Sequence, residues 1–417
     1  MAPHTKYPYS CETPCRSDTL RPSMDYRSHS EEAAPSLASY TVVADRASFS
    51  KMLESVLPAP RIAIDIEADS LYHYFDKVCL IQISTDRETF ILDPLAVEDL
   101  RQLAPILANP AVEKVFHAAG YDVRCLRRDY GFSFANLFDT HLAALLLGYE
   151  QLGLGALMEN LLGIAHSKRR QRDDWSRRPL DIEQLQYAAM DTHHLLPLRD
   201  LLEEQLRDKN RLSWAEEEFA VAASLEQAEK QFDPEGFRRI KGSRLLPLQQ
   251  LAILRALYLL RDRYARELDL PPFKIINNPV LLDLALRPPQ APREMFRRSG
   301  ISHRVARRFA AEIYRTIEKS RLEETSSLVR AEPGQWTPPS KETKQRFENL
   351  RGWRKLKAVE LRLDVGVICP GNILESLAAN PPSDLSVLEE FGCLRRWRAR
   401  EFGPEILDVL CGSPSPA

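Results

Sequence analysis

The chain has 417 residues and a mass of 47.7 kDa, a length that predicts two or three domains. Its composition is 44% hydrophobic and 28% charged, with a mean hydropathy of -0.34, which fits a soluble globular protein and excludes collagen-like and wholly disordered chains. No apolar run reaches the 18 residues of a membrane span, and the first 30 residues lack the apolar stretch of a signal peptide. We therefore expect a cytoplasmic protein with no membrane partner.

The net charge of -2 is distributed unevenly along the chain. Residues 41–210 hold 19 Lys and Arg against 26 Asp and Glu, whereas residues 241–322 hold 17 against 7. This asymmetry favours metal-binding carboxylates in the first segment and a polyanionic partner for the second, with unevenly spread solvated charge as the alternative. The seven cysteines are scattered without a CxxC pair, so we expect neither a disulfide framework nor a zinc site.

The first predicted elements follow residues 1–40, a Pro- and Ser-rich tail without apolar periodicity for which we expect disorder. From Thr41, short β-branched runs separated by turn-prone residues predict a meander of three strands. These strands span residues 61–69, 77–85 and 88–93. A helix near 97–108 and a short strand at 114–118 precede a mostly helical stretch that ends near residue 232. This order predicts an α/β sheet covered by helices.

Beyond residue 240 the strand signals nearly vanish, and an internal repeat appears at an offset of 93 residues. The matched pairs are Arg261 and Arg354, Ala265 and Ala358, Glu267 and Glu360, Leu281 and Leu374, Leu284 and Leu377, Ala285 and Ala378, Pro288 and Pro381, and Pro289 and Pro382. Eight matches in one frame favour a duplicated helical unit. The Pro- and Gly-rich stretch 331–343 between the two copies is typical of a linker.

Asp65 and Glu67 are the first candidates for chemistry. They lie two residues apart near the end of an apolar strand, so the strand period of two places both carboxylates on one face. Buried carboxylates are costly unless they are paired, hydrogen-bonded or bound to a metal ion, which makes the pair a candidate metal site. A structural role is the alternative, because D-x-E is common at strand ends.

Tyr187 and Asp191 form a second pair within LQYAAMDTHHL, a stretch with the apolar periodicity of a helix. A spacing of four residues places the phenol and the carboxylate one turn apart on one helix face, where both can reach one centre. Surface neighbours at this spacing are the alternative. Asp122 follows a short strand at the start of a helix, where an ordinary acidic residue interacting with the helix dipole is the alternative.

Taken together, these residues resemble the DEDD superfamily of 3′-to-5′ exonucleases in its tyrosine-bearing branch. The shared order is D-x-E, an Asp at a strand-to-helix junction about 55 residues later, and Y-x-x-x-D on a helix about 65 residues after that. The surrounding motifs are similar to those of the ribonuclease D family, namely AIDIEADSLYHYFDKVCLIQIS, VFHAAGYDVRCL, LFDTHLAALLLG and QRDDWSRRPLDIEQLQYAAMDTHHLLPL. The resemblance covers roughly residues 41–411, and the duplicated units resemble tandem HRDC domains, which are helical nucleic-acid-binding modules.

The resemblance implies an α/β ribonuclease H-like exonuclease domain followed by two small all-α HRDC-like domains. The expected boundaries are 1–40 for the tail, 41–212 for the exonuclease domain, 213–240 for a helical connector, 241–322 for the first HRDC-like domain, 323–340 for a linker, 341–412 for the second HRDC-like domain and 413–417 for a final tail.

The resemblance also implies a site in which four carboxylates hold two divalent metal ions. These carboxylates are Asp65, Glu67, Asp122 and Asp191. Oxygen ligands without a convergent His or Cys suit Mg²⁺ or Mn²⁺ better than zinc. Tyr187 would orient or deprotonate the attacking water, and the products would be nucleoside 5′-monophosphates. The implied partner is RNA with a free 3′ end, with tRNA precursors as the expected substrate of a monomeric enzyme that needs no nucleotide cofactor.

Further residues are candidates for substrate contact. His117 stands where many superfamily relatives have Asn, and it either lines the pocket of the 3′ nucleotide or is a structural histidine. A basic run either grips phosphates or belongs to a solvated loop, and it comprises Lys168, Arg169, Arg170 and Arg172. Trp175 either stacks on a base or packs the loop. For Asp139 we expect a role as a helix cap.

Two other functions are alternatives. A 3′-to-5′ DNA exonuclease could use the same carboxylate site, because the site would recognise phosphate geometry and not the sugar. A non-catalytic RNA-binding protein could retain the fold, although the presence of all four acids and of Tyr187 argues against it.

Overall fold

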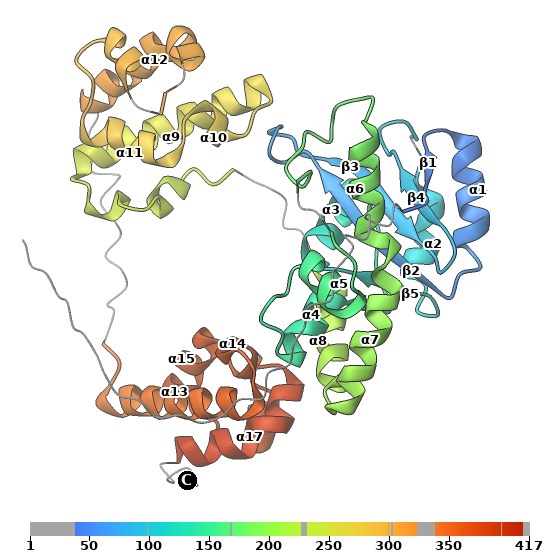
Figure 1. Cartoon of the computed structure of the whole chain (residues 1–417). Helices are drawn as coiled ribbons and strands as arrows, with labels where there is room; N and C mark the ends of the chain where they lie inside the picture. The colour runs from blue at the N-terminus through green and yellow to red at the C-terminus, as the bar shows by residue number, and fades with distance from the viewer. Residues whose placement is uncertain are drawn as a thin grey trace, which may run out of the picture. The chain divides into compact units, whose positions relative to one another are not determined.

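The structure, a computed structural model, describes residues 38–97, 99–166, 169–226, 232–298, 300–301, 303–322, 338–392 and 394–411. Most of the predicted tail 1–40 and of the predicted linker 323–340 lies outside these residues, as do residues 413–417 and Lys168. In the described part of the chain, no helix is long and apolar enough to cross a membrane. We describe three domains, each by itself: a sheet domain (residues 38–226) and two helical domains (Figure 1).

The sheet domain is built on a mixed sheet of six strands. The strands span Thr41–Val43 (β1), Arg61–Ala68 (β2), Val78–Ser84 (β3), Thr89–Leu92 (β4), Glu113–Phe116 (β5) and Leu137–Asp139 (β6). Their order across the sheet is β1-β4-β3-β2-β5-β6. The predicted meander is confirmed, because β2 pairs with β3 and β3 with β4 in antiparallel register. Parallel pairs of β2 with β5, β5 with β6, and β1 with β4 complete the sheet.

Strand β2 places two acids on one face in the middle of this sheet. Asp65 and Glu67 are half-buried, and the residue between them is buried. The register pairs Asp65 with Gln82 and Glu67 with Leu80 of β3, and the ladder shifts at a β-bulge directly after Glu67. The predicted alternation is therefore confirmed, and the bulge bends the strand at the point where the two carboxylates stand.

Helices pack against the sheet, and most were expected from apolar periodicity. They span Arg46–Val56 (α1), Ala104–Ala108 (α2), Gly120–Tyr130 (α3), Thr140–Leu147 (α4), Leu154–Leu162 (α5), Ile182–His193 (α6), Leu195–Asp208 (α7) and Leu212–Ser224 (α8). Helix α6 packs across β2, β3 and β4, as Figure 1 shows. The first half of the predicted connector 213–240 is α8, which packs on β6, α3 and α4.

Three differences from the sequence analysis have local causes. The helix predicted over 97–108 is confirmed only in its second half, because Pro105 starts α2 and a short 3-10 turn over Arg101–Leu103 precedes it. Strands β1 and β6 were not predicted, since three residues are too few for a periodic signal. Helix α1 was not predicted, although Asp45 and Ser48 form a capping box at its start.

The start of α6 is set by Asp181, whose side chain accepts a hydrogen bond from the backbone N–H of Gln184 at 2.8 Å. The amide oxygen of Gln184 accepts in return from the N–H of Asp181 at 3.1 Å. This capping box fixes the first residue of the helix and therefore determines which side chains face the sheet. Tyr187 and Asp191, one turn apart, both face the acids of β2.

Asp139 connects the start of α4 to the turn between β5 and α3. Its side chain is 2% exposed and accepts hydrogen bonds from four backbone N–H groups. Two of these groups begin α4, which confirms the predicted cap. The other two belong to Ala118 and Ala119 in the turn between β5 and α3, where Ala118 has a φ of 60°. Asp139 thus stabilises a left-handed turn that leads directly to Asp122.

Both helical domains repeat one arrangement of helices. The first contains 3-10 turns over Gly236–Arg239, Ser243–Leu245 and Pro292–Arg297 and helices over Leu248–Leu268 (α9), Pro272–Ile275 (α10), Asn278–Leu286 (α11) and His303–Leu322 (α12). The second contains helices over Lys341–Leu361 (α13), Val365–Ile368 (α14), Gly371–Ala379 (α15), Leu385–Glu389 (α16) and Arg396–Leu410 (α17). Helices α9, α10 and α11 have the same lengths as α13, α14 and α15, and each begins 93 residues earlier.

One side-chain contact also recurs at this offset. Arg261 donates a hydrogen bond to the carbonyl of Ile276 at 3.0 Å, and Arg354 donates to the carbonyl of Cys369 at 2.8 Å. In both domains this bond joins the long first helix to the end of the short second one. The recurring helices and the recurring bond confirm the predicted duplication.

Replacing Asp139 by alanine should destabilise the sheet domain by about 2 to 4 kcal/mol, because four backbone N–H groups lose a buried charged acceptor. The thermal unfolding midpoint of this domain should fall by about 5 to 10 °C. Asp99→Ala is the matched control, since it removes an exposed carboxylate that pairs only with Arg101 among the contacts of the described residues. Its midpoint should stay near that of the unchanged protein, and equal shifts in both variants would contradict the role of Asp139.

Candidate active site

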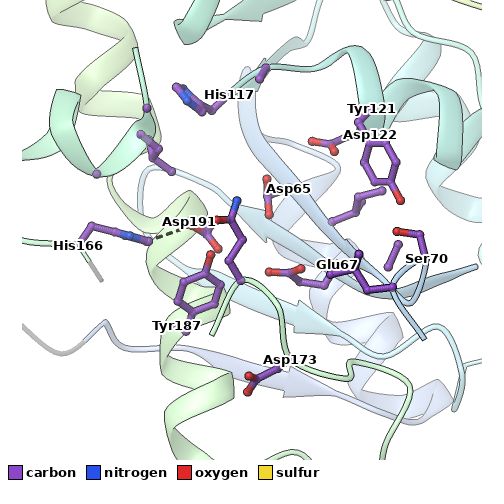
Figure 2. A pocket seen from close by; sticks show the side chains of 18 residues that line it. Asp65, Glu67, Ser70, His117, Tyr121, Asp122, His166, Asp173, Tyr187 and Asp191 are labelled. Carbon is purple, nitrogen blue, oxygen red and sulfur yellow. Dashed lines mark ion pairs between the residues drawn. The ribbon is translucent and has the colours of Figure 1, made fainter. Parts of the chain in front are cut away.

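A cavity of about 450 Å³ opens over the face of β2 that bears the two acids. Strand β2 contributes Asp65 and Glu67, α3 contributes Asp122, and α6 contributes Tyr187 and Asp191 (Figure 2). The volume lies within the range of roughly 300 to 1,000 Å³ that is usual for ligand pockets. The tertiary fold therefore brings together five residues that are far apart in the sequence and that the sequence analysis had singled out.

The carboxylates form a group of three with a fourth beside it. Ligand oxygens of Asp65, Glu67 and Asp191 all lie within 4.8 Å of one another. Asp122 lines the same cavity and is 6% exposed, although its oxygens do not belong to this group of three. Asp65 interacts with every other acid of the site, and the charge of Asp122 is the strongest of these influences on its pKa.

Burial raises the pKa of all four acids, and repulsion by neighbouring carboxylates adds to it for Asp65, Glu67 and Asp122. Burial is the main cause in each case, and for Asp65 the charges of Asp122, Asp191 and Glu67 add to it. Such a site binds protons unless another positive charge replaces them. Among the described residues that line the cavity there is no Lys or Arg, so these residues supply no lysine or arginine charge to offset the carboxylates. A donor set of carboxylate oxygens fits a hard divalent cation such as Mg²⁺ or Mn²⁺.

Tyr187 lies between two rings at the cavity wall. Its ring centroid is 6.0 Å from that of Trp175 and 5.5 Å from that of His166. Burial, followed by the charges of Asp191 and Glu67, raises the pKa of the Tyr187 phenol far above its ordinary value. The phenol is therefore protonated at neutral pH and is a hydrogen-bond donor to groups that enter the cavity.

The DWSRRPL segment supports α6 from the sheet side. Trp175 is 1% exposed, so the structure supports the packing alternative and leaves no open face of this ring for a base. Arg178 anchors the segment, because its guanidinium contacts Asp93 at 2.5 Å and 2.8 Å. It also donates to the carbonyls of Cys79 at 2.8 Å and Trp175 at 2.7 Å. These contacts fix the loop that precedes the capping box of α6.

The other predicted substrate contacts differ in their surroundings. Arg170 forms ion pairs with Asp173 at 3.1 Å, with Asp181 at 3.7 Å and with Glu183. Three carboxylates therefore already compete for the charge that we expected to bind phosphate. Arg172 is exposed on the same loop. His117 lines the cavity, and its Nδ1 lies 3.0 Å from Oγ1 of Thr140.

Two cavity residues did not stand out in the sequence. Asp173 lines the cavity and adds to the raised pKa of Glu67. It belongs to the QRDDWSRRPL motif, so its place in the most specific part of the sequence was a signal that could have identified it. His166 is an isolated histidine on the loop after α5, and its Nε2 lies 3.0 Å from Oδ1 of Asp191. No local pattern marks His166, because its contact depends on tertiary packing.

Comparison with known proteins identifies the family. A family model described as 3′-5′ exonuclease matches residues 40–207, and one described as HRDC domain matches residues 250–317 and 343–410. Ribonuclease D of Zymomonas mobilis is 35% identical over 270 residues, which are 63% of this chain and 68% of that protein. Ribonuclease D of Gluconacetobacter diazotrophicus is 30% identical over 367 residues, which are 87% of this chain and 90% of that protein. This chain belongs to the ribonuclease D family.

Solved structures agree with this assignment. The catalytic core of RRP6 from Trypanosoma brucei has a TM-score of 0.62 at 29% identity and covers 68% of this chain and 79% of its own. Ribonuclease D of Escherichia coli has the same fold, with a TM-score of 0.64 at 23% identity over 91% of this chain and all of its own. The predicted α/β exonuclease domain followed by helical HRDC domains is confirmed. As a member of the ribonuclease D family the protein is a 3′-to-5′ exoribonuclease, which sets aside the non-catalytic alternative.

Replacing Asp65 by asparagine should raise the thermal unfolding midpoint of this protein in EDTA at pH 7. The folded state binds the proton of this carboxyl more tightly than the unfolded state, so ionised Asp65 lowers stability as the pH rises above its ordinary pKa. One unit of pKa corresponds to about 1.4 kcal/mol, so we expect a rise of at least about 3 °C.

The same variant should lose the stabilisation that we expect from Mn²⁺ in the unchanged protein, because the group of three acids loses a candidate ligand. Asp99→Asn, which changes an exposed carboxylate, is the control and should behave like the unchanged protein in both solutions. A lower midpoint for Asp65→Asn in EDTA, or an unchanged response to Mn²⁺, would contradict this account.

Proposed function

We propose that four carboxylates hold two divalent metal ions, Mg²⁺ or Mn²⁺, and that the enzyme hydrolyses RNA one nucleotide at a time from the 3′ end. The carboxylates are Asp65, Glu67, Asp122 and Asp191. The observation that supports this most directly is the grouping of three carboxylates within 4.8 Å, beside a fourth, in a cavity where the described lining residues include no Lys or Arg. The products of this reaction are nucleoside 5′-monophosphates.

Asp65 would be the central acid of this set, because the charges of Asp122, Asp191 and Glu67 all act on it. When bound, two divalent ions supply Lewis acidity, which makes an attacking water more acidic and offsets charge on the leaving 3′ oxygen. The chain itself supplies the placement. Strand β2 and helices α3 and α6 hold the acids at fixed positions around the cavity, so no large rearrangement of ligands accompanies each cycle.

Tyr187 positions the attacking water in this proposal. Its hydroxyl points into the cavity beside Asp191 (Figure 2). Of the two roles considered for it, orientation fits better than proton removal, because burial and neighbouring carboxylates raise the pKa of the phenol. A protonated phenol donates a hydrogen bond that fixes the direction of a nucleophile without taking its proton.

RNA with a free 3′ end is the substrate that family membership supports, and we propose tRNA precursors as its physiological form. The cavity takes the terminal nucleotide, and the first helical domain, with 17 Lys and Arg against 7 acids over residues 241–322, contacts the phosphates of the RNA body. One chain supplies all five candidate residues, so the enzyme acts as a monomer in this proposal. We expect it to work in the cytoplasm.

Digestion of a 3′-extended tRNA and of a single-stranded DNA of matched length tests the substrate and the metal together. We expect stepwise shortening of the RNA in Mg²⁺ or Mn²⁺, release of nucleoside 5′-monophosphates, and no reaction in EDTA. DNA should react at least about 10-fold more slowly, because a site for RNA uses contacts to the 2′-hydroxyl. Equal rates on both substrates would support the DNA exonuclease alternative, and hydrolysis in EDTA would contradict the metal mechanism.

Replacing Tyr187 by phenylalanine should lower kcat by about 10²-fold, because only the hydroxyl that orients the water is removed. The affinity for Mn²⁺, measured by calorimetry without RNA, should be unchanged. Asp191→Asn should lose both activity and Mn²⁺ affinity. Tyr149→Phe is the matched control, since this phenol donates to Gln205 outside the cavity, and it should retain full activity. A loss of Mn²⁺ affinity in Tyr187→Phe would show that the phenol is a ligand.

A further inference from the structure

His166 touches both of the residues that α6 contributes to the cavity. Its side chain is 4% exposed, and its Nε2 lies 3.0 Å from Oδ1 of Asp191 (Figure 2). Its ring packs edge-on against Tyr187, with centroids 5.5 Å apart and an angle of 63° between the rings. One buried side chain is therefore in contact with a proposed metal ligand and with the phenol beside it.

The Nε2 atom of His166 is shielded from solvent and has no directed hydrogen bond among the described residues. At 3.0 Å its contact with Asp191 has the length of a hydrogen bond but not the direction, so in this geometry the contact is electrostatic. A buried polar atom without a hydrogen bond is costly, which indicates that this nitrogen has a partner at some stage of the reaction. Asp191 is the carboxylate within reach.

Close packing on α5 holds His166 in place. Gly155 faces the backbone of His166, and a Cβ at Gly155 would lie 3.1 Å from the carbonyl oxygen and 3.6 Å from the Cβ of His166. Only a residue without a side chain lets the loop approach the helix this closely without a shift. The histidine therefore stands on a fixed part of the cavity wall.

The distances favour an indirect role for His166. Its ring nitrogens do not belong to the group of ligand atoms that lie within 4.8 Å of one another, which consists of Asp65, Glu67 and Asp191 among the described residues. A direct ligand of an ion held by these three acids would be part of that group. Partners that hydrogen-bond a ligating carboxylate set its orientation, and their loss typically lowers metal affinity by about 10- to 100-fold.

We propose that His166 is a positioning residue of this exoribonuclease. Its Nε2–H donates a hydrogen bond to Oδ1 of Asp191, which fixes the carboxylate in the direction of the metal site, and its ring holds Tyr187 at the cavity wall. This proposal rests on the metal-binding role proposed for Asp191. No local sequence pattern indicates the contact between His166 and Asp191, because only tertiary packing brings these two residues together.

Two substitutions that differ in reach test the proposal. In His166→Gln the side-chain amide nitrogen can occupy the place of Nε2. In His166→Asn the side chain is too short for its amide nitrogen to reach Asp191. Calorimetry with Mn²⁺ alone, without RNA, should show an affinity about 10-fold or more weaker for His166→Asn and within about 3-fold of the unchanged protein for His166→Gln. Thermal unfolding in EDTA confirms that each variant is folded before its affinity is compared.

His193→Ala is the matched control, because His193 is on α6, the helix that bears Asp191, but faces away from the cavity. Its Nδ1 lies 2.8 Å from Oγ1 of Thr89 in the sheet. Its Mn²⁺ affinity should equal that of the unchanged protein. Unchanged affinity in His166→Asn overturns the proposal, and so does an equal loss in folded His166→Asn and His166→Gln, which would indicate a direct ligand. If the unchanged protein itself fails to bind Mn²⁺, the metal-binding role of Asp191 is wrong, and this inference fails with it.

Discussion

Repulsion among four crowded carboxylates, two of them buried and two half-buried, is the constraint on which the sheet domain depends. Burial raises the pKa of all four acids, and neighbouring carboxylates raise it further for Asp65, Glu67 and Asp122. No Lys or Arg is among the described residues that line their cavity. An arrangement of this kind is unfavourable without protons or cations, so the rest of the domain has to hold the acids together against their own repulsion. The same repulsion makes the cavity selective for a positively charged partner of small size and high charge density.

Strong interactions outside the cavity hold the elements that bear the acids in place. Asp139 accepts from four backbone N–H groups and orders the turn before Asp122. Arg178 joins the DWSRRPL segment to the sheet through Asp93 and the carbonyl of Cys79. The Asp181 capping box sets the start of α6. Each support is charge-assisted or fully buried, and such interactions restrict motion of the elements that bear the acids.

The two helical domains show how one fold can present different surfaces. Their first three helices coincide at an offset of 93 residues, and the hydrogen bond of Arg261 recurs as that of Arg354. Their charges nevertheless differ, since residues 241–322 hold 17 basic against 7 acidic residues, whereas residues 341–411 hold 12 against 11. The buried contacts define the fold, and the exposed positions are free to diverge in charge. The more basic copy is the better suited of the two to phosphate contacts.

Local periodicity was enough to predict the meander and the shared faces of Asp65 with Glu67 and of Tyr187 with Asp191, and matches at an offset of 93 residues predicted the duplication. A strand or a helix repeats within a few residues, so these patterns are present in any short stretch of the chain. Only the tertiary structure or the family resemblance indicates that β2, α3 and α6 meet in one cavity. The buried position of Trp175, the ion pairs of Arg170 and the contact of His166 with Asp191 likewise depend on packing between distant segments, which no local pattern records.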